Sequence, residues 1–289
     1  MPRSRPVDGF SLEYDRAGAG PAVVLLHGWP GSRSDHRAVA ALLADDADVV
    51  VPDLRGFGGS DRHDRPPSEA YSADAQADSV CGLIEELELD RPVIAGYDVG
   101  GRVAQAVARR RPDDVRALVL APPLPGVGAR VLEPQAQREF WYQPFHQLEL
   151  SERLMDGDAR AVRAYLEHFW SHWSAPGWTV EPERLDALTE QYARPGAFRA
   201  SIGWYRAGAG TVAKALAERP PTPLDRVAVP TAVLWPEHDP LFPLAWSDRI
   251  DEFFADADLT VLDGIGHFVP VEAPDAMAGA IRRRLTLAG

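Results

Sequence analysis

The feature that most constrains the fold is the hexapeptide Gly-Tyr-Asp-Val-Gly-Gly at residues 96–101. The apolar run at 91–95 predicts a buried parallel strand, and the apolar spacing at 102–111 predicts a helix. The residues at this strand–turn–helix corner match the G-x-S-x-G pattern, with Asp98 in place of the central serine. Glycines let the backbone turn tightly there, so we expect Asp98 to project out of the fold and into a pocket.

A carboxylate at this corner restricts the chemistry. Attack on an ester or amide carbonyl would give a mixed anhydride, which is no easier to hydrolyse than the starting compound. Attack on a saturated carbon that carries a leaving group gives an alkyl ester of the enzyme, which water can then cleave. Asp98 is therefore expected to react with an epoxide or an alkyl halide. The alternative is that Asp98 only caps the helix that follows it.

Composition and charge limit the kinds of partner that this protein can bind and the compartment in which we expect it. The 289 residues, 45% of them hydrophobic, can form one large α/β domain or a core with a smaller insertion. The net charge of −13 offers no basic face for nucleic acid or an anionic membrane. The single cysteine, Cys81, excludes an internal disulfide. With no apolar leader or membrane-length run, we expect a cytoplasmic protein that acts as a monomer or homodimer on a small molecule.

Short apolar runs alternate with helical patterns, which is typical of a parallel sheet. We expect an edge strand at Phe10–Tyr14. The buried strands are expected at Ala22–Leu26, Val49–Val51, Pro92–Ala95, Ala117–Leu120, Thr231–Trp235 and Leu259–Leu262.

The alternation stops between the strands expected at 117–120 and 231–235. Residues 128–218 have helical patterns and many aromatic side chains, and Pro/Gly-rich segments flank them. We therefore expect a core domain formed by residues 1–127 and 219–289, with residues 128–218 inserted as a helical cap, or lid.

Three further clusters follow predicted strands, where ligands bind in open α/β sheets. The first is His-Gly-Trp-Pro-Gly at 27–31, and the backbone N–H groups of Trp29 and Val99 are candidates for an oxyanion hole. The second supplies Asp239 as an acid, with Glu237 as its rival. The third supplies His267. The order nucleophile, acid, histidine is that of α/β-hydrolases.

On these residues the chain resembles α/β-hydrolases of the epoxide hydrolase and dehalogenase branch. The resemblance covers nearly the whole chain, including His-Gly-Trp-Pro at 27–30 and Val-Pro-Asp-Leu-Arg-Gly-Phe-Gly-Gly-Ser at 51–60. It implies an α/β-hydrolase fold, a mostly parallel sheet flanked by helices, with a catalytic triad of Asp98, Asp239 and His267. His27 resembles the structural histidine of this family.

The resemblance also implies that two cap tyrosines assist ring opening. Epoxide hydrolases similar to this chain carry one in a Tyr-Gln pattern and another in a Trp-Tyr-Arg-like segment, which Tyr142-Gln143 and Trp204-Tyr205-Arg206 match. Phenols have a pKa near 10, so they stay protonated at neutral pH and can donate to the epoxide oxygen. The expected product is a vicinal diol.

Dehalogenation with the same nucleophile is the main alternative. Haloalkane dehalogenases of this fold carry a tryptophan where this chain has Val99. Fluoroacetate dehalogenases carry arginines one and four residues after the nucleophile, and only Arg102 matches. A ligand-binding receptor and a cofactor-free lyase on the same fold are further alternatives.

No cofactor or metal is expected. His168 and His172 have i, i+4 spacing on a predicted helix, but no carboxylate or cysteine pattern supports a metal there. The residues expected to contact an apolar or aromatic substrate are Trp29, Trp141, Gln143 and Phe145.

Overall fold

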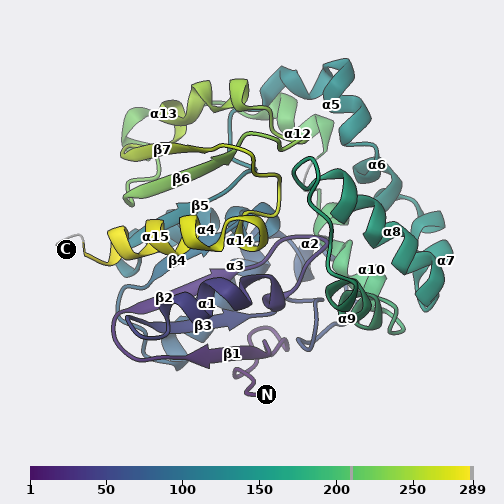
Figure 1. The fold of residues 1–289 in the computed structure, drawn as a ribbon, viewed down its shortest axis with the longest axis horizontal. Coiled ribbons are helices and arrows are strands. Elements are labelled where there is room, and N and C mark those ends of the chain that lie inside the picture. The colour runs from purple at the N-terminus through teal and green to yellow at the C-terminus, as the bar shows by residue number, and fades with distance from the viewer. Residues whose placement is uncertain (209–210, 287–289) are drawn as a thin grey trace.

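The computed structural model describes residues 1–208 and 211–286. A seven-stranded sheet forms its centre, in the order β1-β3-β2-β4-β5-β6-β7 (Figure 1). Only β1 runs antiparallel to its neighbour, β3, and the remaining pairs are parallel. The strands are β1 Tyr14–Ala17, β2 Ala22–Leu26, β3 Asp48–Pro52, β4 Val93–Gly96, β5 Ala117–Leu120, β6 Thr231–Pro236 and β7 Ala257–Leu262.

The central strands are continuous apolar runs because both faces of the sheet are covered. All five residues of β2 and all four of β5 are buried. On one face, α1 (Arg37–Leu43) packs with α15 (Pro274–Leu285), and on the other α3 (Ala73–Glu86) packs with α4 (Asp98–Arg110) (Figure 1).

The edge strand expected at Phe10–Tyr14 is displaced. β1 starts at Tyr14 and pairs with β3 through Ala17. Phe10 forms only an isolated bridge with Val7, and its ring packs in a small separate cluster with Ala70, Tyr71 and Ala200. Phe10 therefore packs beside the sheet and Leu12 joins the main core, whereas the polar residues after Tyr14 suit an edge strand.

The remaining short elements of the sheet region lie in its connections. They are η1 Arg33–His36, α2 Pro67–Ala70, η2 Pro112–Asp114, η4 Pro223–Asp225, η5 Leu244–Arg249, α13 Ile250–Phe253 and α14 Val269–Glu272.

A helical insertion connects β5 to β6 and lies at one end of the sheet (Figure 1). Among the described residues it consists of η3 Gly128–Leu132, α5 Pro134–Glu139, α6 Tyr142–Gln147, α7 Glu149–Met155, α8 Ala159–His172, α9 Pro182–Tyr192, α10 Ala197–Ser201, α11 Gly203–Arg206 and α12 Val212–Ala217.

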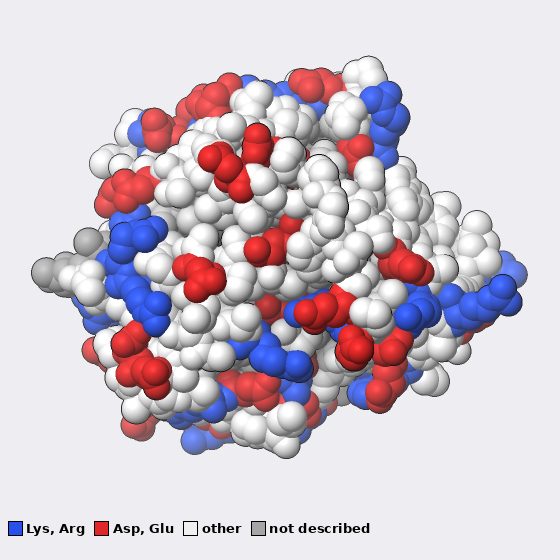
Figure 2. All heavy atoms as spheres, viewed as in Figure 1, with Lys and Arg blue, Asp and Glu red and all other residues white. Residues whose placement is uncertain are grey.

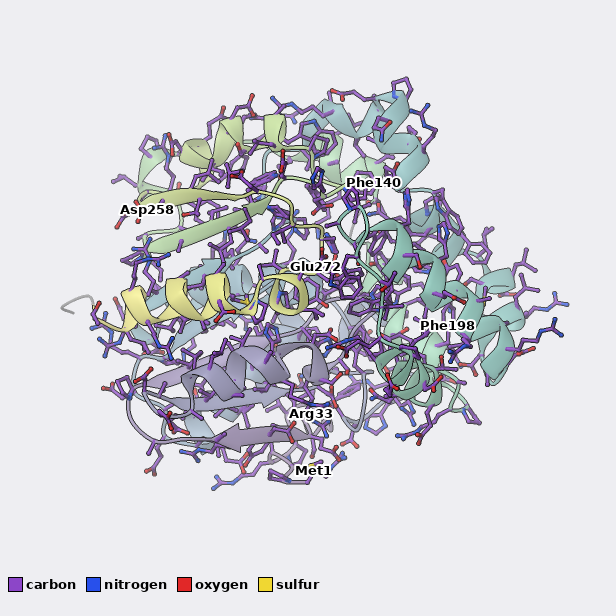
Figure 3. All side chains as sticks on the ribbon, viewed as in Figure 1. Met1, Arg33, Phe140, Phe198, Asp258 and Glu272 are labelled. Atoms are coloured by element: carbon purple, nitrogen blue, oxygen red, sulfur yellow. The ribbon has the colours of Figure 1, made fainter. Side chains whose placement is uncertain are left out.

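Buried contacts hold the insertion against the sheet region. The indole N–H of Trp170 donates to the carbonyl of Pro30 at 3.0 Å, and its ring stacks on Phe268 with centroids 3.8 Å apart. Glu272, labelled in Figure 3 between the two regions, accepts from the backbone N–H groups of Ala175 and Gly266, both at 2.9 Å. These contacts join residues far apart in the chain.

Acidic and basic side chains are interspersed over the face drawn in Figure 2. Within residues 1–208 and 211–286, no helix is both long and apolar enough to cross a bilayer.

Candidate active site

Asp98 occupies a strained turn between β4 and α4. Its φ angle is +49°, in the left-handed region that non-glycine residues rarely adopt. Two nearby glycines have no room for a side chain: a Cβ on Gly100 would lie 2.1 Å from the carbonyl oxygen of Leu26, and one on Gly28, in the loop after β2, would lie 2.5 Å from Cβ of Asp98. The turn therefore depends on glycine, and it directs the Asp98 carboxylate into the cavity described below.

Both carboxylate oxygens of Asp98 have partners. Oδ1 accepts from the backbone N–H of Trp29 at 2.7 Å, and Oδ2 lies 3.7 Å from Nε2 of His267. Val99 follows in the first turn of α4, where backbone N–H groups lack partners within the helix. The amide of Trp29 thus comes from the loop after β2, and the amide of Val99 comes from the first turn of α4.

His267 is paired on its other side with Asp239. Its Nδ1 lies 2.8 Å from Oδ2 of Asp239, whose Oδ1 accepts from the N–H groups of Leu241 and Phe242 at 2.8 and 3.4 Å. The backbone N–H of His267 donates to Trp173 in the insertion at 2.8 Å. Among the described residues, Nε2 of His267 has no hydrogen-bond partner, so it remains available on the Asp98 side.

Burial and charge act in opposite directions on the pKa of His267. Burial lowers it, but the charge of Asp239, its hydrogen bond and the proximity of Asp98 outweigh burial and raise the pKa from 6.5 to about 10. Between two carboxylates, the imidazole of the resting protein is therefore protonated at neutral pH.

The rival acid, Glu237, is placed differently. It is exposed, and its Oε2 accepts from the backbone N–H of Gly264 at 2.8 Å. The structure brings Asp239, and not Glu237, to His267.

Tyr142 from α6 and Tyr205 from α11 approach from the insertion. Their rings meet edge to face with centroids 5.5 Å apart, and both side chains are buried. Burial, then the charge of Asp98, raises the pKa of Tyr142 above its ordinary value; burial and the neighbouring Tyr142 do the same for Tyr205. Both phenols are therefore protonated donors at neutral pH.

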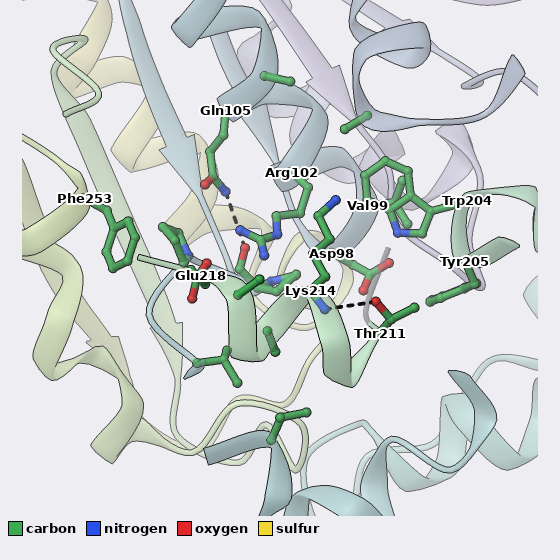
Figure 4. A pocket seen from close by; sticks show the side chains of 18 of the residues that line it. Asp98, Val99, Arg102, Gln105, Trp204, Tyr205, Thr211, Lys214, Glu218 and Phe253 are labelled. Atoms are coloured by element: carbon green, nitrogen blue, oxygen red, sulfur yellow. Dashed lines mark hydrogen bonds between the residues drawn. The ribbon is translucent and has the colours of Figure 1, made fainter. Parts of the chain in front are cut away.

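Asp98 and both tyrosines line one cavity of about 750 Å³ between the sheet region and the insertion (Figure 4). Gln143 also lines it, and its side-chain amide donates to the Tyr142 hydroxyl at 3.4 Å. Trp204 contributes an indole. The apolar part of the wall includes Val127, Val131, Phe140, Phe242 and Phe253.

Three expected substrate contacts are not at this cavity, which corrects the sequence-based expectation. Trp141 is 42% exposed and borders a separate shallow apolar hollow beside Tyr165. Phe145 packs on Trp141 and Tyr165. The ring of Trp29 is fully buried behind Tyr142, with stacked centroids 5.6 Å apart, so only its backbone N–H reaches Asp98.

Sequence reasoning missed two features of the site. Arg109 and Lys214 line the cavity beside Arg102, which had been considered only for dehalogenation. The helical spacing of Asp98, Arg102 and Arg109, which is i, i+4 and i+11, was the available signal for the arginines.

The second missed feature is a buried carboxylate, Asp35, that contacts the neighbour of Asp98. The hydroxyl of Tyr97 donates to Asp35 at 2.7 Å, and Asp35 also pairs with Arg184 of α9 at 3.1 Å. Nothing in the local pattern at 32–36 indicated a buried carboxylate.

Three of the other histidines, His27, His168 and His172, have structural contacts. His27 accepts from the N–H of Leu54 at Nε2, 3.0 Å away, and its Nδ1 lies 2.9 Å from the carbonyl of Gly28. His172 pairs with Glu139 at 2.7 Å and stacks on His168. Over the part of the chain that the structure describes, no group of three or more His, Cys, Asp or Glu side chains could hold a metal ion.

Residues 21–274 match the family described as the alpha/beta hydrolase fold. The chain belongs to this family. It falls in the epoxide hydrolase and dehalogenase branch, as two relatives indicate. It is similar to a fluoroacetate dehalogenase from Burkholderia sp, with 33% identity over 199 residues, which are 68% of this chain and 64% of that protein. It is similar to a soluble epoxide hydrolase from Corynebacterium sp. (strain C12), with 28% identity over 277 residues, 93% and 91% of the two chains.

A crystal structure of a Bacillus megaterium epoxide hydrolase with an inhibitor has the same fold. The TM-score is 0.83 at 21% identity, over 98% of this chain and 99% of that one. This α/β-hydrolase thus shares its architecture with that enzyme across nearly its full length.

Proposed function

We propose that this α/β-hydrolase opens an epoxide to a vicinal diol through a covalent alkyl ester on Asp98. The observation that carries this proposal is the pair of buried phenols, Tyr142 and Tyr205, which line the same cavity as the Asp98 carboxylate. An epoxide oxygen leaves as an alkoxide, which is a poor leaving group unless a donor protonates it. Two neutral hydroxyls beside the nucleophile meet that need.

In the first half-reaction, a carboxylate oxygen of Asp98 attacks one epoxide carbon and the C–O bond of that carbon breaks. The electron pair of that bond stays on the epoxide oxygen, which takes a proton from Tyr142 or Tyr205. The tyrosinate, whose raised pKa favours its protonated form, recovers a proton from the imidazolium of His267 by way of water, and this leaves His267 neutral for the next step. The result is a hydroxyalkyl ester of Asp98.

In the second half-reaction, water attacks the carbonyl carbon of that ester. His267 in its neutral form accepts the proton of the water, and Asp239 orients the imidazole through Nδ1. The negative charge develops on an oxygen of Asp98, near the amides of Trp29 and Val99, and each such donor contributes about 3 kcal/mol to the transition state. Collapse releases the diol and regenerates the carboxylate.

Within this proposal, residues 128–218 act as a cap over a core formed by 1–127 and 219–289. The cap supplies both phenols and the core supplies the triad. Closure between them excludes bulk water from the alkylation step.

Dehalogenation is a second candidate because Arg102 lines the cavity beside Asp98 and one relative is a fluoroacetate dehalogenase. A departing halide needs N–H or guanidinium donors and no proton. Val99 stands where related dehalogenases carry a tryptophan or a second arginine, which favours the epoxide reaction.

The test is a side-by-side assay of styrene oxide, an aliphatic epoxide and fluoroacetate, scoring diol and fluoride, with Asp98→Asn as the inactive control. Diol without fluoride supports the proposal, and fluoride without diol overturns it in favour of dehalogenation. A single turnover in ¹⁸O-labelled water tests the covalent route. Label should appear first in the carboxylate of Asp98, and direct entry into the product would exclude the alkyl ester.

A further inference from the structure

One carboxylate holds the loop that carries His267. Glu272, the last residue of α14, accepts three hydrogen bonds within the described part of the chain, all from backbone N–H groups. Its Oε1 accepts from Phe268 at 3.1 Å, and its Oε2 accepts from Gly266 and Ala175, both at 2.9 Å. Gly266 and Phe268 directly precede and follow His267. Glu272 therefore fixes the backbone on both sides of the imidazole.

Local structure explains two of these three bonds. α14 is a single turn, and Phe268 stands directly before it. Side chains of a helix lean toward its N-terminal end, where backbone N–H groups have no acceptor within the helix. A glutamate in the last position of so short a helix can therefore reach back to the loop before it. The third bond has another origin.

The third donor, Ala175, belongs to the insertion and lies 97 residues before Glu272 in the chain. The insertion meets the His267 loop backbone to backbone. The N–H of His267 donates to the carbonyl of Trp173 at 2.8 Å, and a Cβ on Gly266 would lie 2.3 Å from the backbone nitrogen of Ala175. Glu272 thus bridges two segments that are already in direct contact (Figure 3).

The imidazole ring itself also contacts the insertion. The ring of Trp173, only 1% exposed, meets it edge to face with centroids 5.2 Å apart. On the core side, the ring has one polar anchor, the bond from Nδ1 to Asp239. A shift of residues 173–175 would therefore move His267 relative to Asp98, which lies 3.7 Å from Nε2.

We propose that Glu272 is a positioning residue that holds His267 within reach of the Asp98 ester, and that it does so by locking residues 173–175 of the insertion onto the His267 loop. Glu272 is not among the residues that line the cavity, so it acts through His267 and does not touch the substrate. The use of His267 in ester hydrolysis rests on the proposed function, whereas the placement of the imidazole does not.

The two half-reactions give the first test, because alkylation needs only Asp98 and the phenols whereas hydrolysis needs His267. Glu272→Gln keeps the size of the side chain but replaces one acceptor oxygen by an amide N–H₂ group. Rapid mixing with styrene oxide, followed by intact mass measurement, gives the two rates separately. We expect hydrolysis to slow roughly 100-fold, as for a base displaced by about 1 Å, and alkylation to change less than about 3-fold. Equal slowing of both steps, or of neither, would overturn the proposal.

Gly266→Ala disturbs the same contact without removing a charge. The added methyl group would collide with the backbone of Ala175, so the loop and the insertion must separate. This variant should also slow hydrolysis selectively. The double variant should lose little more than the more severe single variant, since both changes break one contact. Losses that multiply would overturn the shared contact.

Glu237→Gln is the matched control. Its exposed carboxylate accepts from Gly264 of the same loop at 2.8 Å and has no hydrogen bond to the described part of the insertion. Both rates should stay at the wild-type level in this variant, and selective loss of hydrolysis here would overturn the specific role of Glu272. Thermal unfolding shows which variants fold, and either Glu272→Gln or Gly266→Ala alone is sufficient to decide the rate test.

NMR titration of the imidazole separates this proposal from the proposed function, because it needs no substrate. Asp239 and Asp98 raise the pKa of His267 to about 10. An imidazole displaced from them should have a pKa roughly 1 pH unit lower, in Glu272→Gln and in Gly266→Ala alike. That shift, without ester or diol from the wild-type protein, would keep the positioning role and refute the epoxide reaction. An unchanged pKa in both variants, or a shift in Glu272→Gln alone, would overturn the positioning role even if the wild-type protein forms diol.

Discussion

Nε2 of His267 lies 3.7 Å from Oδ2 of Asp98, so the imidazole senses the charge of that carboxylate directly. In the resting protein Asp98 helps to raise the pKa of His267 to about 10, against the effect of burial. In the proposed mechanism, alkylation of Asp98 would remove its negative charge. The pKa of His267 would then fall, which would produce the neutral base when the ester needs water. On this proposal, Asp98 controls the protonation of His267.

Asp98→Asn should reproduce this change without substrate. Loss of one nearby opposite charge is expected to lower the pKa of His267 by roughly 1–3 pH units. NMR titration of the imidazole measures this shift in pKa, with Glu237→Gln as a control that removes an exposed carboxylate from the loop that carries Asp239. An unchanged His267 titration in Asp98→Asn would contradict the coupling.

Protonation of His267 also contributes to folding stability. The folded pKa of about 10 exceeds the ordinary value of 6.5, so the contribution is fully present below pH 6.5 and is lost as pH rises through 10. Between these limits the free energy of unfolding of the wild-type protein should fall more steeply than that of His267→Gln. Urea unfolding at intervals across this pH range measures both slopes, and parallel slopes would argue against a raised pKa.

The same His267→Gln protein should trap the covalent ester. Alkylation needs only Asp98 and the phenols, whereas hydrolysis needs the base, so the ester should accumulate. Intact mass measurement after mixing with styrene oxide should give the mass of the protein plus one epoxide, mapped to Asp98 by peptide analysis. Absence of this adduct with a good substrate would count against covalent catalysis.

Much of this architecture can be predicted from local apolar pattern. β2 and β5 have the expected bounds because both faces of the sheet are covered, and each strand is a continuous apolar run. The edge strand is less predictable, since only one of its sides is paired. Phe10 packs in a cluster beside the sheet, while β1 starts at Tyr14.

The direction in which a side chain of the insertion points cannot be predicted from the local sequence pattern. Trp141 and Tyr142 are adjacent, yet one is exposed and the other lines the cavity. α6 is too short for periodicity to define its buried face, and how it docks against α8 and α11 decides which aromatic points inward. Contacts such as Asp35 with Arg184 depend on two segments far apart in the chain, so neither segment alone predicts them.

Removal of one phenol should slow ring opening. Tyr142→Phe or Tyr205→Phe is expected to reduce the rate of alkylation by roughly 10²–10⁴-fold, because a positioned acid no longer protonates the alkoxide. Tyr165→Phe is the matched control, since this buried phenol bonds His146 at 3.0 Å and does not line the cavity. Single-turnover kinetics give the alkylation rate, and a double variant with unchanged turnover would remove both tyrosines from the mechanism.

The contact between Asp35 and Arg184 should hold the insertion on the loop that carries Trp29. Asp35 is inaccessible, with 0% of its side chain exposed against 17% for Arg184. Its second oxygen accepts from Tyr97 at 2.7 Å and from the N–H of Ser32 at 3.0 Å. Burial raises the pKa of Asp35, and Arg184 is the charge that counters burial most strongly. Without Arg184, the carboxylate would be a buried charge with only neutral donors.

Arg184→Gln should therefore lower the free energy of unfolding by about 1–3 kcal/mol, less than for a fully buried pair because the guanidinium is partly solvated. Arg163→Gln breaks an ion pair with Asp186 whose side chains are 41% and 65% exposed, and it should cost at most about 1 kcal/mol. Urea unfolding compares the two variants, and equal losses would mean that burial of Asp35 adds nothing to the contact. Because Asp35 bonds Tyr97, the residue directly before Asp98, Arg184→Gln should also reduce kcat more than Arg163→Gln does, although neither arginine lines the cavity.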